Sequence, residues 1–295
     1  MRALEPTLTG YAHNPADGVR SYYEAFGSQQ AADTIVFLPT WSLVHSRVWK
    51  MQAPYFARRG FRVVTFDGRG NGNSDRPACG YTTNDFTQDT LAVCDALGIE
   101  RAALVGYSAG GRWGIQFAAQ YPERVSQLVL IAPSVRLHGG ARLALDAFLA
   151  NPPDREGWNK FNAVHWREQY DDFVIWFVSQ LFSEPHSTKP FDNFVAWGHE
   201  TSPDVLIATT VESASPHIAE HARSITCPVL LIHGSDDQVA PLTLSTDLLD
   251  VLPDARLVIL EGSGHAPSAR DPVKVNLLIH AFLNEHREAA GYARA

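Results

Sequence analysis

The feature that most limits the fold of this 295-residue chain is a regular alternation of short apolar segments with helix-like segments. In the first half, the pattern predicts helices at 48–59, 86–97 and 111–120, and strands at 19–26, 34–38, 61–66, 102–105 and 125–131. Short, continuously apolar strands separated by helices are typical of parallel sheets. We therefore expect an α/β fold whose mostly parallel central sheet has helices on both faces.

The alternation stops at Pro133, and a mainly helical pattern replaces it up to about residue 215. Several large side chains in this stretch are spaced to share one helix face: Trp166, Tyr170, Phe173, Phe177 and Leu181. The stretch also holds 12 of the chain's 31 aromatic residues, which indicates an insertion folded over an apolar cleft. Most of these rings are expected to pack the insertion against the rest of the protein, because aromatic side chains bury large apolar surfaces.

The alternation then returns, with strands predicted at 229–233 and 257–260 and helices at 242–252 and 271–286. The two alternating parts together describe one sheet. The sequence therefore predicts a core domain formed by residues 1–134 and 216–295, interrupted by a helical cap at 135–215.

The composition limits the kind of partner. A net charge of −8 argues against nucleic acid or an anionic membrane surface, since both attract clusters of Lys and Arg. No apolar run is long enough for a secretion signal or a membrane span. The three cysteines, Cys79, Cys94 and Cys227, are too scattered for a disulfide framework, and their odd number suits a reducing compartment. We expect a cytoplasmic protein with a small-molecule partner, and the sequence does not indicate the oligomeric state.

A candidate nucleophile lies in the pentapeptide Gly106-Tyr107-Ser108-Ala109-Gly110. The G-x-S-x-G pattern alone is weak evidence, because chance produces it in roughly one chain in ten of this length. Here, however, it follows a predicted strand and precedes a predicted helix. A sharp strand-to-helix turn of this kind exposes the serine hydroxyl, as a nucleophile elbow requires.

A serine hydroxyl needs a base within hydrogen-bond reach and an acid that orients the base. Asp236 and Asp237 directly follow the strand predicted at 229–233, at the edge where α/β sheets gather their functional groups. His265 lies in a glycine-containing loop after the last predicted strand. The order serine, acid, histidine predicts Ser108 and His265 as nucleophile and base, with Asp236 and Asp237 both suitable as the acid.

These segments and motifs together resemble the α/β-hydrolases over nearly the whole chain, specifically those with a helical cap after the sixth sheet strand. In that family the acid loop reads G-x-x-D with a proline four residues later, which fits Gly234, Asp237 and Pro241. The resemblance therefore implies Asp237 as the acid. It also implies that Asp67-Gly68-Arg69-Gly70-Asn71-Gly72-Asn73-Ser74 is a structural glycine turn beside the active site, since the spacing of a phosphate-binding loop is absent.

The resemblance also implies an oxyanion hole formed by two backbone N–H groups, those of Trp41 and Ala109. The family usually has a His-Gly pair before the first of these donors, but this chain has Pro39-Thr40. Because threonine lacks the backbone freedom of glycine, we expect an unusual shape for this loop. The Trp41 ring is either a wall of the acyl pocket or a packed side chain.

The predicted function is hydrolysis of a small apolar carboxylic ester through a Ser108, His265 and Asp237 triad and an acyl-enzyme. Metal-site motifs such as H-E-x-x-H are absent, and no cofactor is expected. Fold and triad leave open the cleavage of C–C bonds, lactones or amides, and cofactor-free perhydrolysis. A non-catalytic ligand receptor that retains the pocket is the alternative from another class.

Overall fold

The computed structural model describes residues 3–137, 141–185, 187–212 and 215–292. Its described part contains an eight-stranded sheet in the order β1-β2-β4-β3-β5-β6-β7-β8. The strands are β1 (Leu8–His13), β2 (Arg20–Phe26), β3 (Thr34–Phe37), β4 (Arg62–Phe66), β5 (Ala102–Tyr107), β6 (Val125–Ile131), β7 (Val229–Gly234) and β8 (Ala255–Leu260). Pairing is antiparallel between β1 and β2 and between β2 and β4, and parallel from there to β8. The predicted mostly parallel α/β sheet is confirmed.

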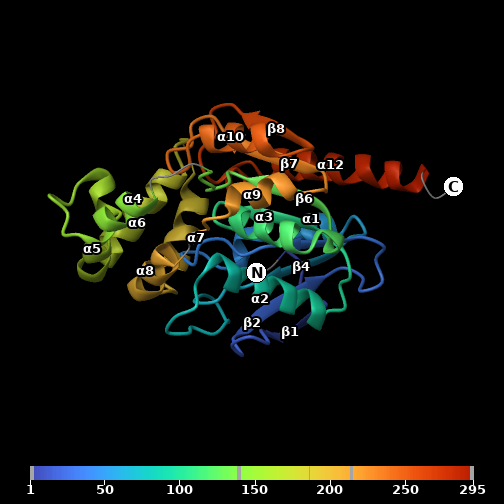
Figure 1. The fold of residues 1–295 in the computed structure, drawn as a ribbon, viewed down its shortest axis with the longest axis horizontal. Coiled ribbons are helices and arrows are strands. Elements are labelled where there is room, and N and C mark those ends of the chain that lie inside the picture. Colours follow the sequence, from blue (N-terminus) through green and yellow to red (C-terminus); the bar gives the residue numbers. More distant parts are fainter. Residues whose placement is uncertain (1–2, 138–140, 186, 213–214, 293–295) are drawn as a thin grey trace.

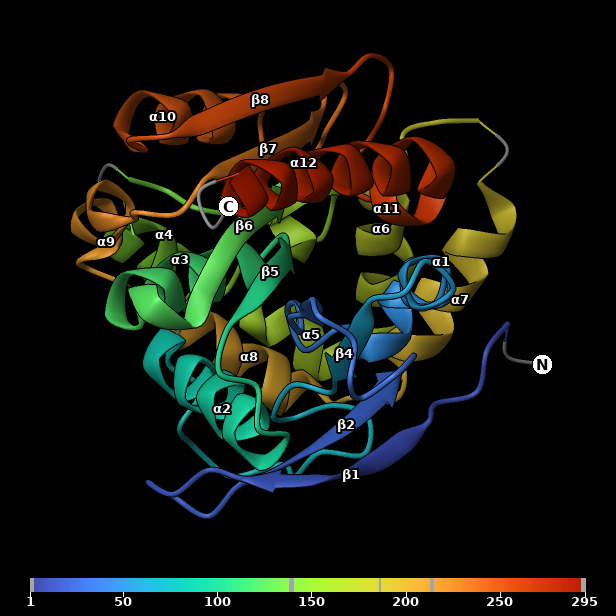
Figure 2. The same cartoon turned by 90° about the vertical axis from the view of Figure 1, so that its right-hand side faces the viewer.

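Helices cover both faces of the sheet, as Figure 2 shows. Along β3, Ile35 and Phe37 pack into one apolar cluster, whereas Val36 belongs to a second cluster on the opposite face. The first cluster includes side chains of α1 (Ala53–Ala57) and α12 (Pro272–Tyr292). The second includes side chains of α2 (Thr83–Ala96), α3 (Gly110–Gln120), α9 (Ile218–Ser224) and α10 (Thr243–Val251). A strand buried on both faces explains why the sequence shows continuous apolar runs.

The helical insertion follows β6, as predicted, and Figure 1 shows its helices gathered on one side of the sheet. We refer to this insertion as the cap; its boundaries at residues 135 and 215 remain predictions. Its described helices are α4 (Ala141–Leu149), η3 (Gly157–Lys160), α5 (Ala163–Glu168), α6 (Tyr170–Leu181), α7 (Thr188–Gly198) and α8 (Pro203–Val211). None of the helices in the described ranges is long and apolar enough to cross a membrane.

Two expectations about individual elements were wrong, and one strand was missed. The helix predicted at 48–59 is a short η1 (Ser46–Trp49) followed by α1, because Pro54 has no backbone N–H to continue a helix from η1 and suits the first turn of a new helix. The shared helix face from Trp166 to Leu181 is divided between α5 and α6 at Gln169, whose φ of −142° and ψ of 52° are not helical. Strand β1 was not predicted, since most of its residues are exposed and form no apolar run.

Candidate active site

Ser108 lies in a tight turn between β5 and α3, with a φ of +52° that residues other than glycine rarely adopt. The flanking glycines permit this turn because a side chain would not fit. A Cβ at Gly106 would lie 2.5 Å from the carbonyl oxygen of Gly110, and one at Gly110 would lie 2.5 Å from that of Pro39. The backbone of Ser108 is further held by a hydrogen bond from its N–H to Ile131. Such a strained, supported turn is what a nucleophile elbow requires.

The structure brings the side chains of Ser108, His265 and Asp237 into one chain of hydrogen bonds. The Nε2 atom of His265 is 2.9 Å from the Ser108 hydroxyl oxygen, and its Nδ1 atom is 2.7 Å from Oδ2 of Asp237. A carboxylate only accepts hydrogen bonds, so Nδ1 carries the hydrogen and Nε2 accepts from the serine hydroxyl. In this tautomer His265 can take the proton of Ser108.

Asp237, rather than its neighbour Asp236, faces His265. The Oδ1 atom of Asp237 accepts hydrogen bonds from the N–H groups of Val239 and Ala240, each at 2.8 Å. Its Oδ2 atom is shared between His265 and a second imidazole, that of His233, whose Nε2 lies 3.1 Å away. Asp236 instead is exposed and accepts a hydrogen bond from the adjacent serine hydroxyl.

The environment of Asp237 keeps its side chain ionised, although the side chain is fully buried. Burial raises the pKa of this carboxyl, but the attraction of His265 and the hydrogen bonds from His233, His265 and Ala240 outweigh that effect. The net pKa therefore lies well below its ordinary value. A carboxylate at this position can fix the orientation of His265 and stabilise its protonated form.

The two predicted oxyanion donors, the N–H groups of Trp41 and Ala109, lie on segments that approach each other closely. Gly110 makes this approach possible, since its missing Cβ leaves room for the Pro39 carbonyl oxygen. Among the described residues, neither N–H group donates to another protein group. Both are thus free to bind a negatively charged oxygen, and their role remains a prediction.

The Trp41 side chain lies against the cap. Its indole N–H donates a 2.9 Å hydrogen bond to the hydroxyl oxygen of Thr209 on α8. Its ring centroid is 5.3 Å from that of Phe177 and 5.6 Å from that of Trp166. Thr209 could not be identified from the sequence, because no pattern relates a threonine of the insertion to a tryptophan 168 positions earlier.

The cavity beside Ser108 is small, with a volume of about 30 Å³. The residues that line it come from the core and the cap: Thr40, Trp41, Leu43, Val44, Tyr107, Ser108, Phe177, Leu181, Phe194 and His265. Ligand pockets for small molecules typically measure about 300–1,000 Å³. The space that these side chains leave beside the serine is therefore much smaller than a typical ligand pocket.

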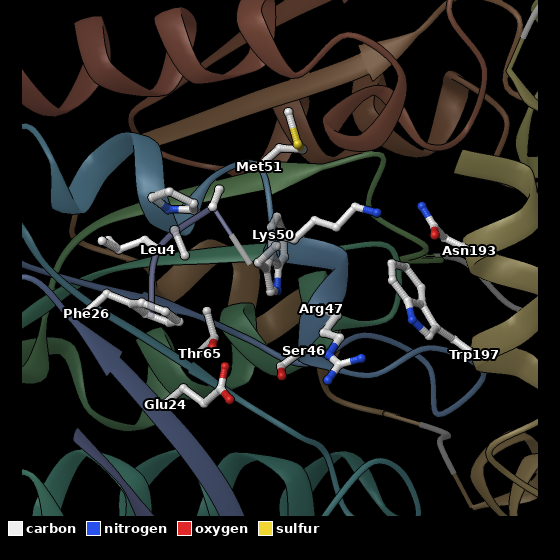
Figure 3. Close-up of a pocket in the computed structure, with 14 residues that line it drawn as sticks. Leu4, Glu24, Phe26, Ser46, Arg47, Lys50, Met51, Thr65, Asn193 and Trp197 are labelled. Atoms are coloured by element: carbon white, nitrogen blue, oxygen red, sulfur yellow. The ribbon is translucent and has the colours of Figure 1, made fainter. Parts of the chain in front are cut away.

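A larger cavity of about 470 Å³ lies elsewhere, between the N-terminal segment, η1 and α7. Figure 3 shows Lys50 extending across it toward Asn193 and Trp197, with Leu4 and Phe26 on the other side. Neither Ser108 nor His265 lines this cavity. Cavity size alone would therefore locate the site away from the hydrogen-bonded chain.

The loop that follows β4 is held by buried polar contacts. Arg69 is fully buried and forms an ion pair with Asp89 at 2.7 Å. Asp67 accepts hydrogen bonds from the backbone of Ser46 at 3.0 Å and of Asn73 at 2.9 Å. These contacts give the loop a structural role. In the described ranges, no group of three or more possible metal ligands is found.

Comparison with known proteins agrees with this architecture. The profile of a family described as alpha/beta hydrolase fold matches residues 33–272. AB hydrolase superfamily protein YisY of Bacillus subtilis is 28% identical over 262 residues, covering 85% of this chain and 91% of that protein. A 2-hydroxy-6-oxononadienedioate/2-hydroxy-6-oxononatrienedioate hydrolase of Paraburkholderia phymatum is 29% identical over 235 residues, covering 78% and 79%. An esterase structure from Exiguobacterium antarcticum superposes with a TM-score of 0.81 at 21% identity, covering 94% of this chain and 100% of that one.

Proposed function

Because this chain belongs to the alpha/beta hydrolase fold family and is a hydrolase, we propose that it cleaves small carboxylic esters through an acyl-enzyme on Ser108. The observation that carries the proposal is the hydrogen-bonded chain from Ser108 through His265 to the ionised Asp237. The apolar cap residues beside the serine favour an apolar acyl group. The cleavage of C–C bonds, lactones or amides can use the same three groups. The Paraburkholderia relative, for example, is named as a hydrolase of 2-hydroxy-6-oxononadienedioate and 2-hydroxy-6-oxononatrienedioate.

In the proposed acylation step, the Ser108 oxygen attacks the ester carbonyl carbon while Nε2 of His265 takes the hydroxyl proton. The carbonyl oxygen becomes negatively charged, and the N–H groups of Trp41 and Ala109 stabilise it. Asp237 stabilises the imidazolium that forms. When the tetrahedral intermediate collapses, the C–O bond to the alcohol breaks and His265 returns the proton to the leaving oxygen.

In the proposed deacylation step, a water molecule replaces the alcohol. His265 takes a proton from this water as its oxygen attacks the acyl carbon of the Ser108 ester. The tetrahedral intermediate collapses to release the carboxylic acid, and His265 returns the proton to the Ser108 oxygen. The protein is then in its starting state, and the reaction has consumed one ester and one water molecule.

The experiment that tests the proposal is covalent labelling combined with burst kinetics. A fluorophosphonate is expected to add one phosphonyl group per chain, and peptide mapping is expected to find it on Ser108. An activated p-nitrophenyl ester is expected to release about one equivalent of nitrophenol before steady turnover. Stoichiometric ligand binding with neither adduct nor burst would instead support a receptor. Comparing p-nitrophenyl esters with lactones and a ring-fission dienoate by kcat/KM then ranks the substrate classes.

Replacing Thr209 with valine is expected to weaken the binding of the oxyanion indirectly. Thr209 holds the side chain of Trp41, and the backbone N–H of Trp41 is one of the two proposed oxyanion donors. Valine has the shape of threonine but cannot accept the hydrogen bond of the Trp41 indole, which would then be buried without a partner. We expect kcat to fall by roughly 3- to 10-fold and unfolding to become easier by about 1–3 kcal/mol. The measurement is the affinity for a trifluoromethyl ketone, which mimics the tetrahedral oxyanion. Thr209→Ser keeps the acceptor and is expected to keep the affinity; equal affinities in all three proteins would contradict the prediction.

A further inference from the structure

The end of α6 is attached to the loop that carries His265. The backbone N–H of His265 donates a 3.1 Å hydrogen bond to the carbonyl oxygen of Leu181, the last residue of α6. Three residues later, Oε1 of Glu184 accepts a 2.7 Å hydrogen bond from the N–H of Gly264 and a 3.3 Å hydrogen bond from the hydroxyl of Ser263. Successive residues of the histidine loop are thus held by the cap.

Gly264 is a glycine because the cap segment lies against it. Its φ is not positive, so it does not need the conformational freedom of glycine. A Cβ at this position would lie 2.8 Å from the Ser183 hydroxyl oxygen and 3.0 Å from the Leu181 carbonyl oxygen. The lack of a Cβ at Gly264 therefore lets the cap segment and the histidine loop lie in close contact.

The two oxygen atoms of the Glu184 carboxylate differ in their contacts. Within the described ranges its Oε2 atom is buried and has no hydrogen-bond partner. A buried polar atom without a partner destabilises the folded state. What the carboxylate does provide is a strong acceptor for the backbone immediately before His265.

The same part of the cap lines the cavity at Ser108. Phe177 and Leu181 of α6 line that cavity, whose volume of about 30 Å³ cannot hold an ester. The end of α6 therefore supplies both a wall of this cavity and the contacts to the histidine loop. Any displacement of the end of α6 would act on both the cavity and the support of His265.

We propose that Glu184 is a positioning residue, a cap carboxylate that holds the backbone of Gly264 so that His265 is aligned with Ser108 only when the cap is closed. This proposal rests on the proposed function, since it assigns a role relative to His265 as the base. The Glu184 contact breaks when the cap moves to admit the ester and forms again when the cap returns over the bound acyl group. Proton transfer by His265 then coincides with exclusion of bulk water.

The test compares Glu184→Ala with a matched change elsewhere in the cap. Glu212, at the end of α8, also joins cap to core, since its Oε2 accepts hydrogen bonds from the N–H groups of Gly80 at 3.0 Å and Tyr81 at 2.7 Å. Those residues lie on a different loop from His265. For Glu184→Ala we expect kcat and kcat/KM to fall together by roughly 10- to 100-fold, with a parallel loss in the rate of Ser108 phosphonylation. For Glu212→Ala we expect a lower Tm but a kcat within about 2-fold of the unmodified protein.

Two further variants separate positioning from charge and protect the test against unfolding. Glu184→Gln keeps an oxygen that can accept from Gly264 and is expected to retain most of the activity. Glu184→Asp keeps the charge but is one methylene shorter, so it is expected to lose activity as Glu184→Ala does. Equal kcat values for Glu184→Ala, Glu184→Asp and the unmodified protein would overturn the proposal, as would an equal loss in Glu212→Ala. Failure of the proposed function is a separate outcome, because it would appear as ester turnover that survives the loss of Ser108.

Discussion

Replacing Ser108 with alanine is expected to lower kcat for p-nitrophenyl esters by about 10⁴-fold or more. The variant lacks the only atom that forms the proposed acyl bond, and His265 then has no hydroxyl proton to take. The fold is expected to persist, because the substitution removes a single oxygen atom and keeps the backbone contacts that hold the turn. Steady-state kinetics on freshly purified protein, with Tm as a check on folding, measure the effect.

A nearby serine supplies the control for this prediction. Ser134 lies beside the nucleophile turn, where its backbone N–H donates to the carbonyl oxygen of Ser108. Ser134→Ala keeps that backbone contact and is expected to keep kcat within about 2-fold. If Ser108→Ala turns over esters or reacts with the fluorophosphonate as well as Ser134→Ala does, Ser108 is not the nucleophile.

Replacing Asp237 with asparagine is expected to lower kcat by on the order of 10³- to 10⁴-fold, because it reverses the polarity of the hydrogen bond to His265. Val239 and Ala240 both donate to Oδ1, so the amide oxygen of asparagine must occupy that position. The NH₂ group then faces Nδ1 of His265. That nitrogen must accept, which leaves the hydrogen on Nε2 and prevents Nε2 from taking the proton of Ser108.

Asp236 offers a control of the same chemistry one residue earlier. Its side chain is exposed and does not face His265, so Asp236→Asn is expected to keep kcat within about 2-fold. Loss of activity in Asp236→Asn with full activity in Asp237→Asn would reverse the assignment of the acid.

The Asp237→Asn variant is also expected to differ from the unmodified protein in how its free energy of unfolding depends on pH. Because folding lowers the pKa of Asp237, its ionised form stabilises the protein fully above the unfolded value of about 4, and this contribution is lost as the pH falls through the folded value. The difference in unfolding free energy between the unmodified protein and Asp237→Asn should be largest near neutral pH and shrink below pH of about 4. Denaturant titrations at several pH values measure it.

The sequence carried enough information to predict every strand of the sheet except β1, and, with the family resemblance that favoured Asp237 over Asp236, the members of the hydrogen-bonded chain. Each of Ser108, Asp237 and His265 follows a predicted strand, and parallel strands direct their carboxyl ends to one edge of the sheet. Residues that follow such strands are therefore close in space even when they are far apart in sequence. Their catalytic roles stay predictions until the variants above are measured.

What could not be predicted depends on contacts between distant segments or on exposed structure. The edge strand β1 pairs through its backbone, which leaves no apolar signature in its side chains. The break at Gln169 interrupts a helix whose periodicity continues across it. The contacts of Thr209 with Trp41 and of Glu184 with Gly264 join cap and core, and polar pairs of this kind follow no periodic pattern.

The small cavity at Ser108 has a consequence for how substrates are ranked. If only the fraction of molecules with an open cap can accept an ester, the apparent affinity is the intrinsic affinity reduced by that fraction. Each ester is then selected by the free energy gained when the cap closes over it, as well as by its fit in the cavity. An acyl chain that packs well against the aromatic side chains of the cap favours reclosure, whereas a smaller ester that enters more easily gains less from it. Under the proposed cap movement, selectivity is a bias in an opening equilibrium, and it extends to acyl chains larger than the present cavity.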